Sequence, residues 1–141
     1  MPYRNQVALN LPSKDLDASA RFATGLGLTP PKFSAGFGAM FQHGEHTMIF
    51  FHDYKTFGGW LPADRKISDA TAVAQVVVSL TAPSREKVDG MIEGAIKAGG
   101  KIGPKMVPNE SEYGMYSRSV EDPDGHLFEV YFHEHIGSGS V

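Results

Sequence analysis

The stretch Glu121-Asp-Pro-Asp-Gly-His-Leu-Phe-Glu-Val-Tyr-Phe132 joins a tight turn to a strand, and it decides how the whole chain is interpreted. Pro123 fixes its own φ and Asp124-Gly125 supplies the positive φ of a reversal, so we expect a hairpin here. Alternation along the strand then gives an apolar face of Phe128, Val130 and Phe132, and a second face of Leu127, Glu129, Tyr131 and His133. An anion among apolar neighbours is costly unless it lines a cleft or meets a cation, so Glu129 indicates a pocket.

Composition limits the classes of protein to which the chain can belong. Its 141 residues suffice for one domain, and the absence of cysteine excludes disulfides, thiolate metal sites and cysteine nucleophiles. The net charge of -3, with both signs scattered, argues against nucleic-acid binding. No apolar run approaches the ~20 residues of a membrane span. The segment Met1-Pro-Tyr-Arg-Asn5 lacks the apolar core of a signal peptide, so we expect a cytoplasmic protein without membrane contact.

The first half of the chain alternates between strand and helix patterns. Gln6 to Leu11 has the period of a half-buried strand that Pro12 ends, and Ser13 is a candidate N-cap for the helix that follows. The remaining expected elements are a helix stop at Gly25-Leu-Gly27, a loop at Pro30-Pro31, short segments around Phe33 and Met40-Phe41, and a strand from Thr47 to His52.

The second half repeats this order after an irregular connection from Asp53 to Thr71. Its expected elements are a strand from Val73 to Leu80, a helix capped by Ser84 and ended by Gly99-Gly100, short strands at Lys101–Val107 and Tyr113–Val120, and the hairpin strand. Each half therefore has the order βαβββ, and a repeat of this size is a strong signal of fold.

We accordingly predict an α+β fold in which two βαβββ modules form curved mixed sheets around a cleft. The expected single domain spans 1–136, with modules at about 1–65 and 72–136 and a flexible tail at 137–141. One helix covers one face of each sheet, which leaves the opposite faces to line the cleft. By alternation these faces carry Gln6, Ala8, Asn10, Met48, Phe50, His52, Gln75, Val77, Ser79 and the Glu129 face of the last strand, a mixture typical of a small-molecule site.

Four motifs carry a resemblance to a known family. They are Asn10-Leu-Pro-Ser-Lys-Asp-Leu16, Phe22 with Leu26-Gly27, Ala98-Gly99-Gly100, and Glu121-Asp-Pro-Asp-Gly-His-Leu-Phe-Glu129, of which the last is the most specific. Over nearly its whole length the chain resembles the vicinal oxygen chelate superfamily. That superfamily holds glyoxalase-type lyases, extradiol dioxygenases, fosfomycin-modifying enzymes and bleomycin-binding resistance proteins, and the chain is most similar to its uncharacterised glyoxalase-like branch.

The resemblance implies a metal ligand on each of four strands, at Gln6, Phe50, Gln75 and Glu129. Phe50 cannot coordinate, so the candidate metal positions reduce to Gln6, Gln75 and Glu129, of which two are neutral amides. Catalytic zinc usually has three strong N, O or S donors, so we expect no firmly bound cofactor and keep a divalent metal as the alternative. A displaced metal site that uses His52 remains a second alternative.

Glu129 is the candidate catalytic residue, as a metal ligand, a general base or a structural acceptor, and the sequence leaves these roles open. The candidate ligand-binding residues are Gln6, Asn10, Phe50, His52, Gln75 and Tyr131. We assign the other turn and tail histidines, His43, His46, His126 and His135, to the solvated surface. Tyr54, Phe57 and Trp60 are interpreted as a subunit contact, with closure over a ligand as the alternative, because the resemblance implies a homodimer.

The sequence thus supports a small-molecule binding protein or a metal-independent enzyme with a degenerate metal site. One alternative is a metal-dependent lyase similar to lactoylglutathione lyase, or an extradiol dioxygenase. Another is a bleomycin-type antibiotic-binding resistance protein, for which Glu129 and nearby aromatic residues are compatible with a cationic drug. The ligand, the reaction and the dimer geometry are not determined by one sequence.

Overall fold

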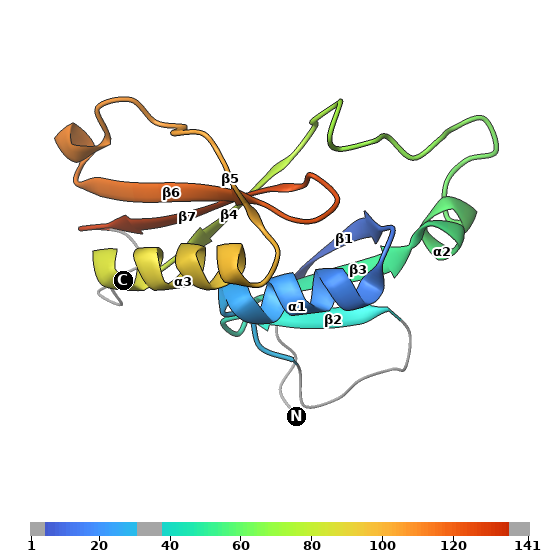
Figure 1. Ribbon diagram of the computed structural model, residues 1–141, viewed down its shortest axis with the longest axis horizontal. Coiled ribbons are helices and arrows are strands. Elements are labelled where there is room, and N and C mark those ends of the chain that lie inside the picture. The colour runs from blue at the N-terminus through green and yellow to red at the C-terminus, as the bar shows by residue number, and fades with distance from the viewer. Residues whose placement is uncertain (1–4, 31–37, 136–141) are drawn as a thin grey trace.

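A computed structural model describes residues 5–30 and 38–135, in which two long helices lie side by side and pack against two sheets (Figure 1). The elements are β1 (Val7–Ser13), α1 (Leu16–Leu26), β2 (Ala39–His43), β3 (Thr47–Asp53), α2 (Tyr54–Gly59), β4 (Val77–Thr81), α3 (Arg85–Lys97), β5 (Lys101–Ile102), the 3-10 helix η1 (Glu110–Tyr113), β6 (Met115–Glu121) and β7 (Leu127–His133). The fold is α+β and consists of two modules, as predicted. The expected segment around Phe33 and the tail at 137–141 lie outside the described residues.

Both modules pair their first strand in parallel with their last strand. The sheet orders are β1-β3-β2 and β4-β7-β6-β5. In the first sheet Asn10 lies opposite Phe50, and in the second Ser79 lies opposite Glu129. The other pairings are antiparallel, so the three described strands of the first sheet are arranged like β4, β7 and β6 of the four-stranded second sheet, which confirms the repeat that the sequence indicated.

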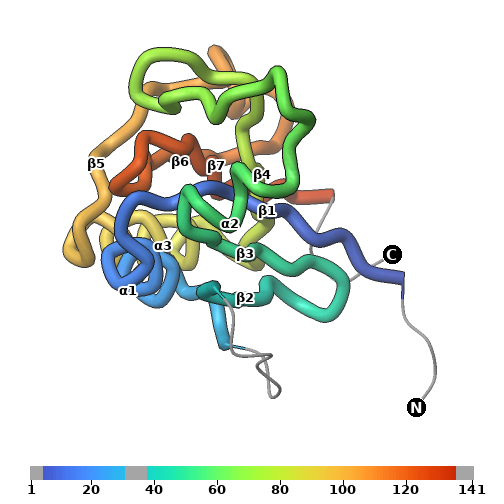
Figure 2. The backbone as a smooth tube through the Cα atoms, turned by 90° about the vertical axis from the view of Figure 1, so that its right-hand side faces the viewer, coloured from blue at the N-terminus to red at the C-terminus, as the bar shows by residue number. Residues whose placement is uncertain are grey.

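The core lies between the sheets and the helices α1 and α3, which Figure 2 shows next to each other. Phe128 and Val130 are fully buried, and the Phe128 ring centroid lies 5.4 Å from that of Phe22 on α1. The apolar face of β7 therefore points toward the helices, and strand alternation places Glu129 on the opposite face, as predicted. Within the described ranges, no helix has the length and apolar character needed to cross a membrane.

Two glycines let α1 and α3 approach closely. A Cβ atom added to Gly94 would lie 2.2 Å from the backbone oxygen of Gly25, and one added to Gly25 would lie 2.5 Å from that of Gly94. No side chain fits at either position, because real Cβ atoms do not approach backbone oxygens so closely. The helix contact is therefore a direct contact between backbones, and it sets how the two modules sit against each other.

The predicted helix ends are largely confirmed. Gly27 ends α1 with a φ of 97°, and the Ser84 side chain accepts a hydrogen bond from the Lys87 amide at the start of α3. The prediction of Ser13 as the N-cap of α1 was wrong. The Asp15 side chain accepts the hydrogen bond from the Ala18 amide, at 3.1 Å. The strand β1 continues through Pro12 to Ser13, which is possible because β1 is an edge strand and proline is tolerated there.

Other boundaries differ from the prediction for local reasons. The connection expected to be irregular contains α2, whose N-cap Asp53 accepts from the Thr56 amide at 2.7 Å. The strand expected from Val73 begins at Val77, because the Val73 amide donates into a turn at Asp69. The strand expected over Lys101–Val107 ends at Ile102, because Gly103 and Pro104 follow it. The strand expected from Tyr113 begins at Met115, because η1 occupies the preceding residues.

The turn before β7 fastens the second module to the first. Gly125 has a φ of 92°, which confirms the predicted reversal, and Asp122 Oδ1 accepts from the amides of Asp124 and His126 at 3.0 and 2.8 Å. The Asp124 carboxylate accepts from the Lys14 amide, just before α1, and from the Ser19 hydroxyl within it. The turn before β7 thus also forms a contact between the two modules.

Candidate functional site

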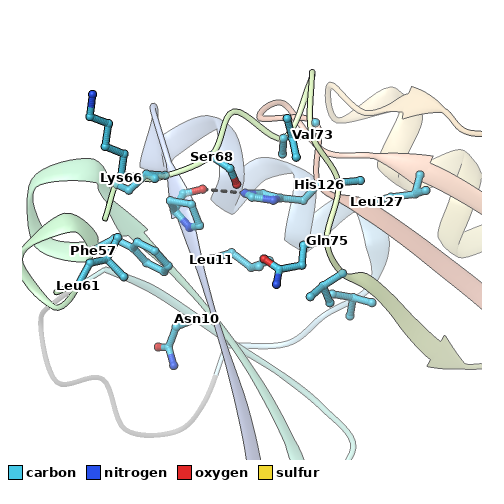
Figure 3. A pocket seen from close by; sticks show the side chains of 17 residues that line it. Asn10, Leu11, Phe57, Leu61, Lys66, Ser68, Val73, Gln75, His126 and Leu127 are labelled. Carbon is cyan, nitrogen blue, oxygen red and sulfur yellow. Dashed lines mark hydrogen bonds between the residues drawn. The ribbon is translucent and has the colours of Figure 1, made fainter. Parts of the chain in front are cut away.

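A pocket of about 310 Å³ lies where the two modules meet (Figure 3). Its walls come from the end of β1, from α2 and the connection after it, and from the starts of β4 and β7. It is lined by Asn10, Leu11, Pro12, Phe57, Leu61, Lys66, Ile67, Ser68, Ala70, Val73, Ala74, Gln75, Val76, Val78, Gly125, His126 and Leu127. We call this cavity the junction pocket. A largely apolar wall with a few polar groups is typical of a site for a small organic molecule.

Asn10 and His52 form a hydrogen-bonded pair at the edge of this pocket. His52 Nε2 lies 2.8 Å from Asn10 Oδ1. The His52 ring is only 2% exposed, and its centroid lies 4.5 Å from the Trp60 ring. Burial lowers the pKa of His52, an effect that the nearby Asp53 carboxylate only partly opposes. The imidazole is therefore neutral at physiological pH, and it acts on the pocket through Asn10.

His126 lines the junction pocket, so its assignment to the solvated surface was wrong. Its Nε2 lies 2.8 Å from the Pro12 carbonyl oxygen, the contact dashed in Figure 3. A carbonyl oxygen only accepts, so the proton is on Nε2. Sequence reasoning missed this histidine because its partner, Pro12, is 114 residues away. The sequence signal that could have identified His126 as a pocket residue is its position between the turn and the first residue of β7.

A cluster of possible metal-binding atoms lies beside His126. Over the described part of the chain, Asp122, Asp124 and His126 bring ligand atoms within 4.8 Å of one another. Most of those atoms already make hydrogen bonds, within the turn, to the Lys14 amide before α1, to the Ser19 hydroxyl on α1 and to the Pro12 carbonyl on β1. Burial raises the pKa of Asp122 to about 6, although the His126 charge opposes the shift. Asp122 Oδ2 is buried without a partner among the described residues, and the hydrogen bonds of the other atoms join the two modules.

Glu129 lies on β7 outside the junction pocket. Its side chain is 8% exposed, and Oε1 accepts a hydrogen bond from the Ser79 hydroxyl at 2.8 Å. Ser119 lies opposite it on β6. Tyr131, two residues further on, is half-buried and also does not line the pocket. The hydrogen bond gives Glu129 a structural partner on the neighbouring strand.

Only some of the predicted site residues therefore line the junction pocket. Asn10 and Gln75 line the junction pocket, and His52 contacts it through Asn10. The remaining predicted ligand-binding residues, Gln6, Phe50 and Tyr131, do not line it, and neither does the candidate catalytic residue Glu129. The ring centroid of Phe50 lies 6.1 Å from that of His52. Phe57 does line the pocket, so one member of the predicted aromatic contact faces this cavity.

Two further polar groups make hydrogen bonds that the sequence did not reveal. His43 is half-buried rather than solvated, and its Nε2 donates to the Thr81 carbonyl of the other module at 2.9 Å. Burial lowers the pKa of His43. Glu110 is 7% exposed and accepts from Lys105 and from the Ser117 hydroxyl. Burial opposes its ionisation, yet these hydrogen bonds outweigh burial and lower the pKa of Glu110.

The sequence itself matches a family model. The model describes the Glyoxalase/Bleomycin resistance protein/Dioxygenase superfamily and matches residues 5–130. The chain belongs to this superfamily. Comparison with curated protein sequences found no match.

Solved structures share the superfamily fold. A hypothetical protein from S. aureus has a TM-score of 0.72 at 24% identity, over 93% of this chain and 95% of that one. A glyoxalase/bleomycin resistance protein/dioxygenase family enzyme from Burkholderia phytofirmans PsJN has a TM-score of 0.69 at 19% identity, over 92% and 98%. A lactoylglutathione lyase from Agrobacterium tumefaciens has a TM-score of 0.62 at 21% identity, over 96% and 98%. At these identities the likeness concerns the fold alone.

The four positions that the superfamily resemblance assigns to metal ligands do not fit a metal in this chain. Phe50 has no donor atom, and the exposed Gln6 uses its amide nitrogen to donate to the Glu45 carbonyl at 3.2 Å. Gln75 lines the junction pocket, which Glu129 does not. One carboxylate and two neutral amides are a weak donor set for a catalytic transition metal. We therefore derive no chemistry from a metal at these positions.

Proposed function

We propose that this superfamily member binds a small organic molecule in the junction pocket, as a binding protein or as an enzyme that needs no metal at the four superfamily positions. The pocket itself carries the proposal. Its volume of about 310 Å³ and its aliphatic and aromatic walls suit a molecule of one or two rings. Asn10, Gln75 and His126 supply the few polar groups that orient a ligand.

The pocket offers less to the alternative functions. No acidic side chain is among the described residues that line it, so these residues offer no carboxylate to a cationic antibiotic. A metal-dependent lyase would need donors that Phe50 does not supply. The lactoylglutathione lyase with this fold is only 21% identical, so the likeness concerns the fold and not the reaction.

Filling the pocket with a larger side chain tests the proposal. Ala74 lines the pocket, whereas the exposed Ala63 in the same connection does not. The only tryptophan, Trp60, lies with its ring centroid 6.0 Å from that of the lining residue Phe57, so its fluorescence reports on occupancy. We expect fragments such as 2-naphthoate to bind with a Kd of roughly 1 mM, the affinity expected for a fragment of this size.

Ala74→Phe should weaken this binding roughly tenfold or more, because the added ring occupies part of the pocket that the ligand would fill. Ala63→Phe is the matched control and should bind as the parent does. Equal affinity of the parent and Ala74→Phe, with both variants folded by circular dichroism, would place the ligand elsewhere. Metal analysis of the purified protein gives an independent test of metal independence, since a stoichiometric transition metal required for turnover would overturn that part of the proposal.

A further inference from the structure

The hydrogen bond between His52 and Asn10 fixes which atoms Asn10 offers to a ligand. A neutral imidazole carries one N–H, on either Nε2 or Nδ1. Nε2 lies 2.8 Å from the Asn10 amide, and Nδ1 is buried without a hydrogen-bond partner among residues 5–30 and 38–135. If Nδ1 carried the proton, a buried N–H would have no acceptor, an arrangement that folded proteins rarely tolerate. The proton is therefore on Nε2, and Asn10 accepts it through Oδ1.

The amide nitrogen of Asn10 is what remains for a ligand. With Oδ1 engaged by His52, the Nδ2 group has two N–H donors that no described protein group accepts. Asn10 is exposed and lines the junction pocket. Rotating the amide by half a turn would break the bond to His52 and bring two donors together. The Asn10 side chain therefore acts as a donor with a fixed orientation.

The charges around the pocket favour the same kind of ligand. Lys66 lines the pocket, and no aspartate or glutamate in the described part of the chain does. Figure 3 shows the Lys66 side chain extending away from the other labelled groups, so it adds positive charge at the rim and not a contact inside. The Lys66 ammonium and the Asn10 N–H donors, both at the edge of the pocket, favour oxygen acceptors over ammonium groups.

We propose that the junction pocket selects a largely apolar molecule that carries an acceptor oxygen, a carbonyl or carboxylate, which the Asn10 Nδ2 group binds. His52 is a positioning residue in this proposal, because it holds the amide and does not touch the ligand. The inference rests on the proposed function, and it adds the chemical class of the ligand. Asn10 is thereby the specificity-determining residue of the pocket.

Three probes with the same ring system test the inference on the unmodified protein. They are 2-acetylnaphthalene with a carbonyl, 2-naphthoate with a carboxylate, and 2-naphthylmethylammonium with donors only. We expect both acceptor probes to bind roughly tenfold tighter than the ammonium probe, because the latter leaves the Asn10 donors unpaired. A preference for only one acceptor probe identifies the oxygen group and supports the inference. Equal affinities, or a preference for the ammonium probe, would overturn it.

Two variants and one NMR spectrum test the roles of Asn10 and His52 separately. Asn10→Asp has nearly the same shape and replaces the donors by an acceptor, so the ammonium probe should become the preferred one. His52→Phe keeps a buried ring but frees the amide, so the preference should shrink severalfold while the naphthalene ring still binds. The 15N spectrum of His52 should show the Nε2–H form, and an Nδ1–H form would contradict the argument. If no probe binds the unmodified protein, the proposed function itself fails.

Discussion

The Asp124 carboxylate accepts a hydrogen bond from the Lys14 amide at 2.9 Å, across 110 residues of sequence. Asp124 is 6% exposed, and its second oxygen accepts from the Ser19 hydroxyl at 3.4 Å. The turn that begins the last strand therefore holds the start of the first helix. This contact sets one side of the junction pocket, because Pro12 and Gly125 beside it both line that pocket.

Asp124→Ala should destabilise the protein by about 2 to 3 kcal/mol. The substitution removes a charged acceptor and leaves the Lys14 amide without its partner, a loss of that size for a hydrogen bond to a charged group. Urea denaturation at pH 7 measures the change. Asp64→Ala, at an exposed position in the connection after α2, is the control and should change stability by less than about 0.5 kcal/mol.

Asp122→Asn should change the pH dependence of stability. Burial raises the pKa of Asp122 from 3.8 to about 6, so the folded state binds this proton more tightly than the unfolded state. Its contribution to stability is full below pH 3.8 and is lost as the pH rises through 6. The loss amounts to about 2 to 3 kcal/mol at 1.4 kcal/mol per pKa unit.

The asparagine variant keeps the Oδ1 acceptor of the turn but does not titrate. Relative to the parent it should therefore gain about 2 to 3 kcal/mol between pH 4 and pH 8, in urea denaturation at several pH values. Asp64→Asn should run parallel to the parent over this range. Parallel curves for Asp122→Asn as well would show that Asp122 has an ordinary pKa.

Gly94→Ala and Gly90→Ala should have opposite effects, although both lie in α3. The methyl group at position 94 would meet the Gly25 carbonyl oxygen at 2.2 Å, so the helices must separate, at a cost of about 1 to 3 kcal/mol. Nothing lies within 4 Å of a Cβ at Gly90, and alanine there should add about 0.5 to 1 kcal/mol through helix propensity. Thermal unfolding of both variants checks the pair. Similar melting temperatures for the two would disprove the close contact.

Glu129→Gln should leave both the fold and the binding of naphthalene probes in the junction pocket unchanged within about twofold. The amide oxygen still accepts from Ser79, and position 129 does not line the pocket. Tryptophan fluorescence titration provides the measurement, with Ala74→Phe as the variant that does lose affinity. A tenfold loss of affinity in Glu129→Gln would mean that the ligand lies against the Glu129 face of β7, which the sequence analysis assigned to the lining of the cleft.

Much of the fold followed from local signals that tertiary context did not override. The alternation of Phe128, Glu129 and Val130 assigned the faces of β7 correctly, because side-chain direction along a strand is a property of the backbone. The predicted ends of helices and strands were less accurate where several side chains could form hydrogen bonds with the same backbone amides. Asp15, not Ser13, is the N-cap of α1. Asp53 caps α2, a helix in a segment whose sequence has no periodicity.

The candidate site was predicted only in part. Alternation identified Asn10 and Gln75 as facing a cavity but also grouped them with Glu129, which does not line the same cavity. His126 was missed because a histidine after a turn is usually solvated, and nothing local shows that Pro12 lies beside it. Cytoplasmic location, the homodimer and the roles of the site residues stay predictions.

The sequence by itself determined the order of the main strands, the two long helices, the reversal at Gly125 and the duplication into two modules, since each depends on periodicity or on a single backbone conformation. The tertiary structure alone decided which polar groups of the two halves meet. Those meetings depend on how closely α1 and α3 approach at Gly25 and Gly94, a distance set by packing between segments far apart in the chain.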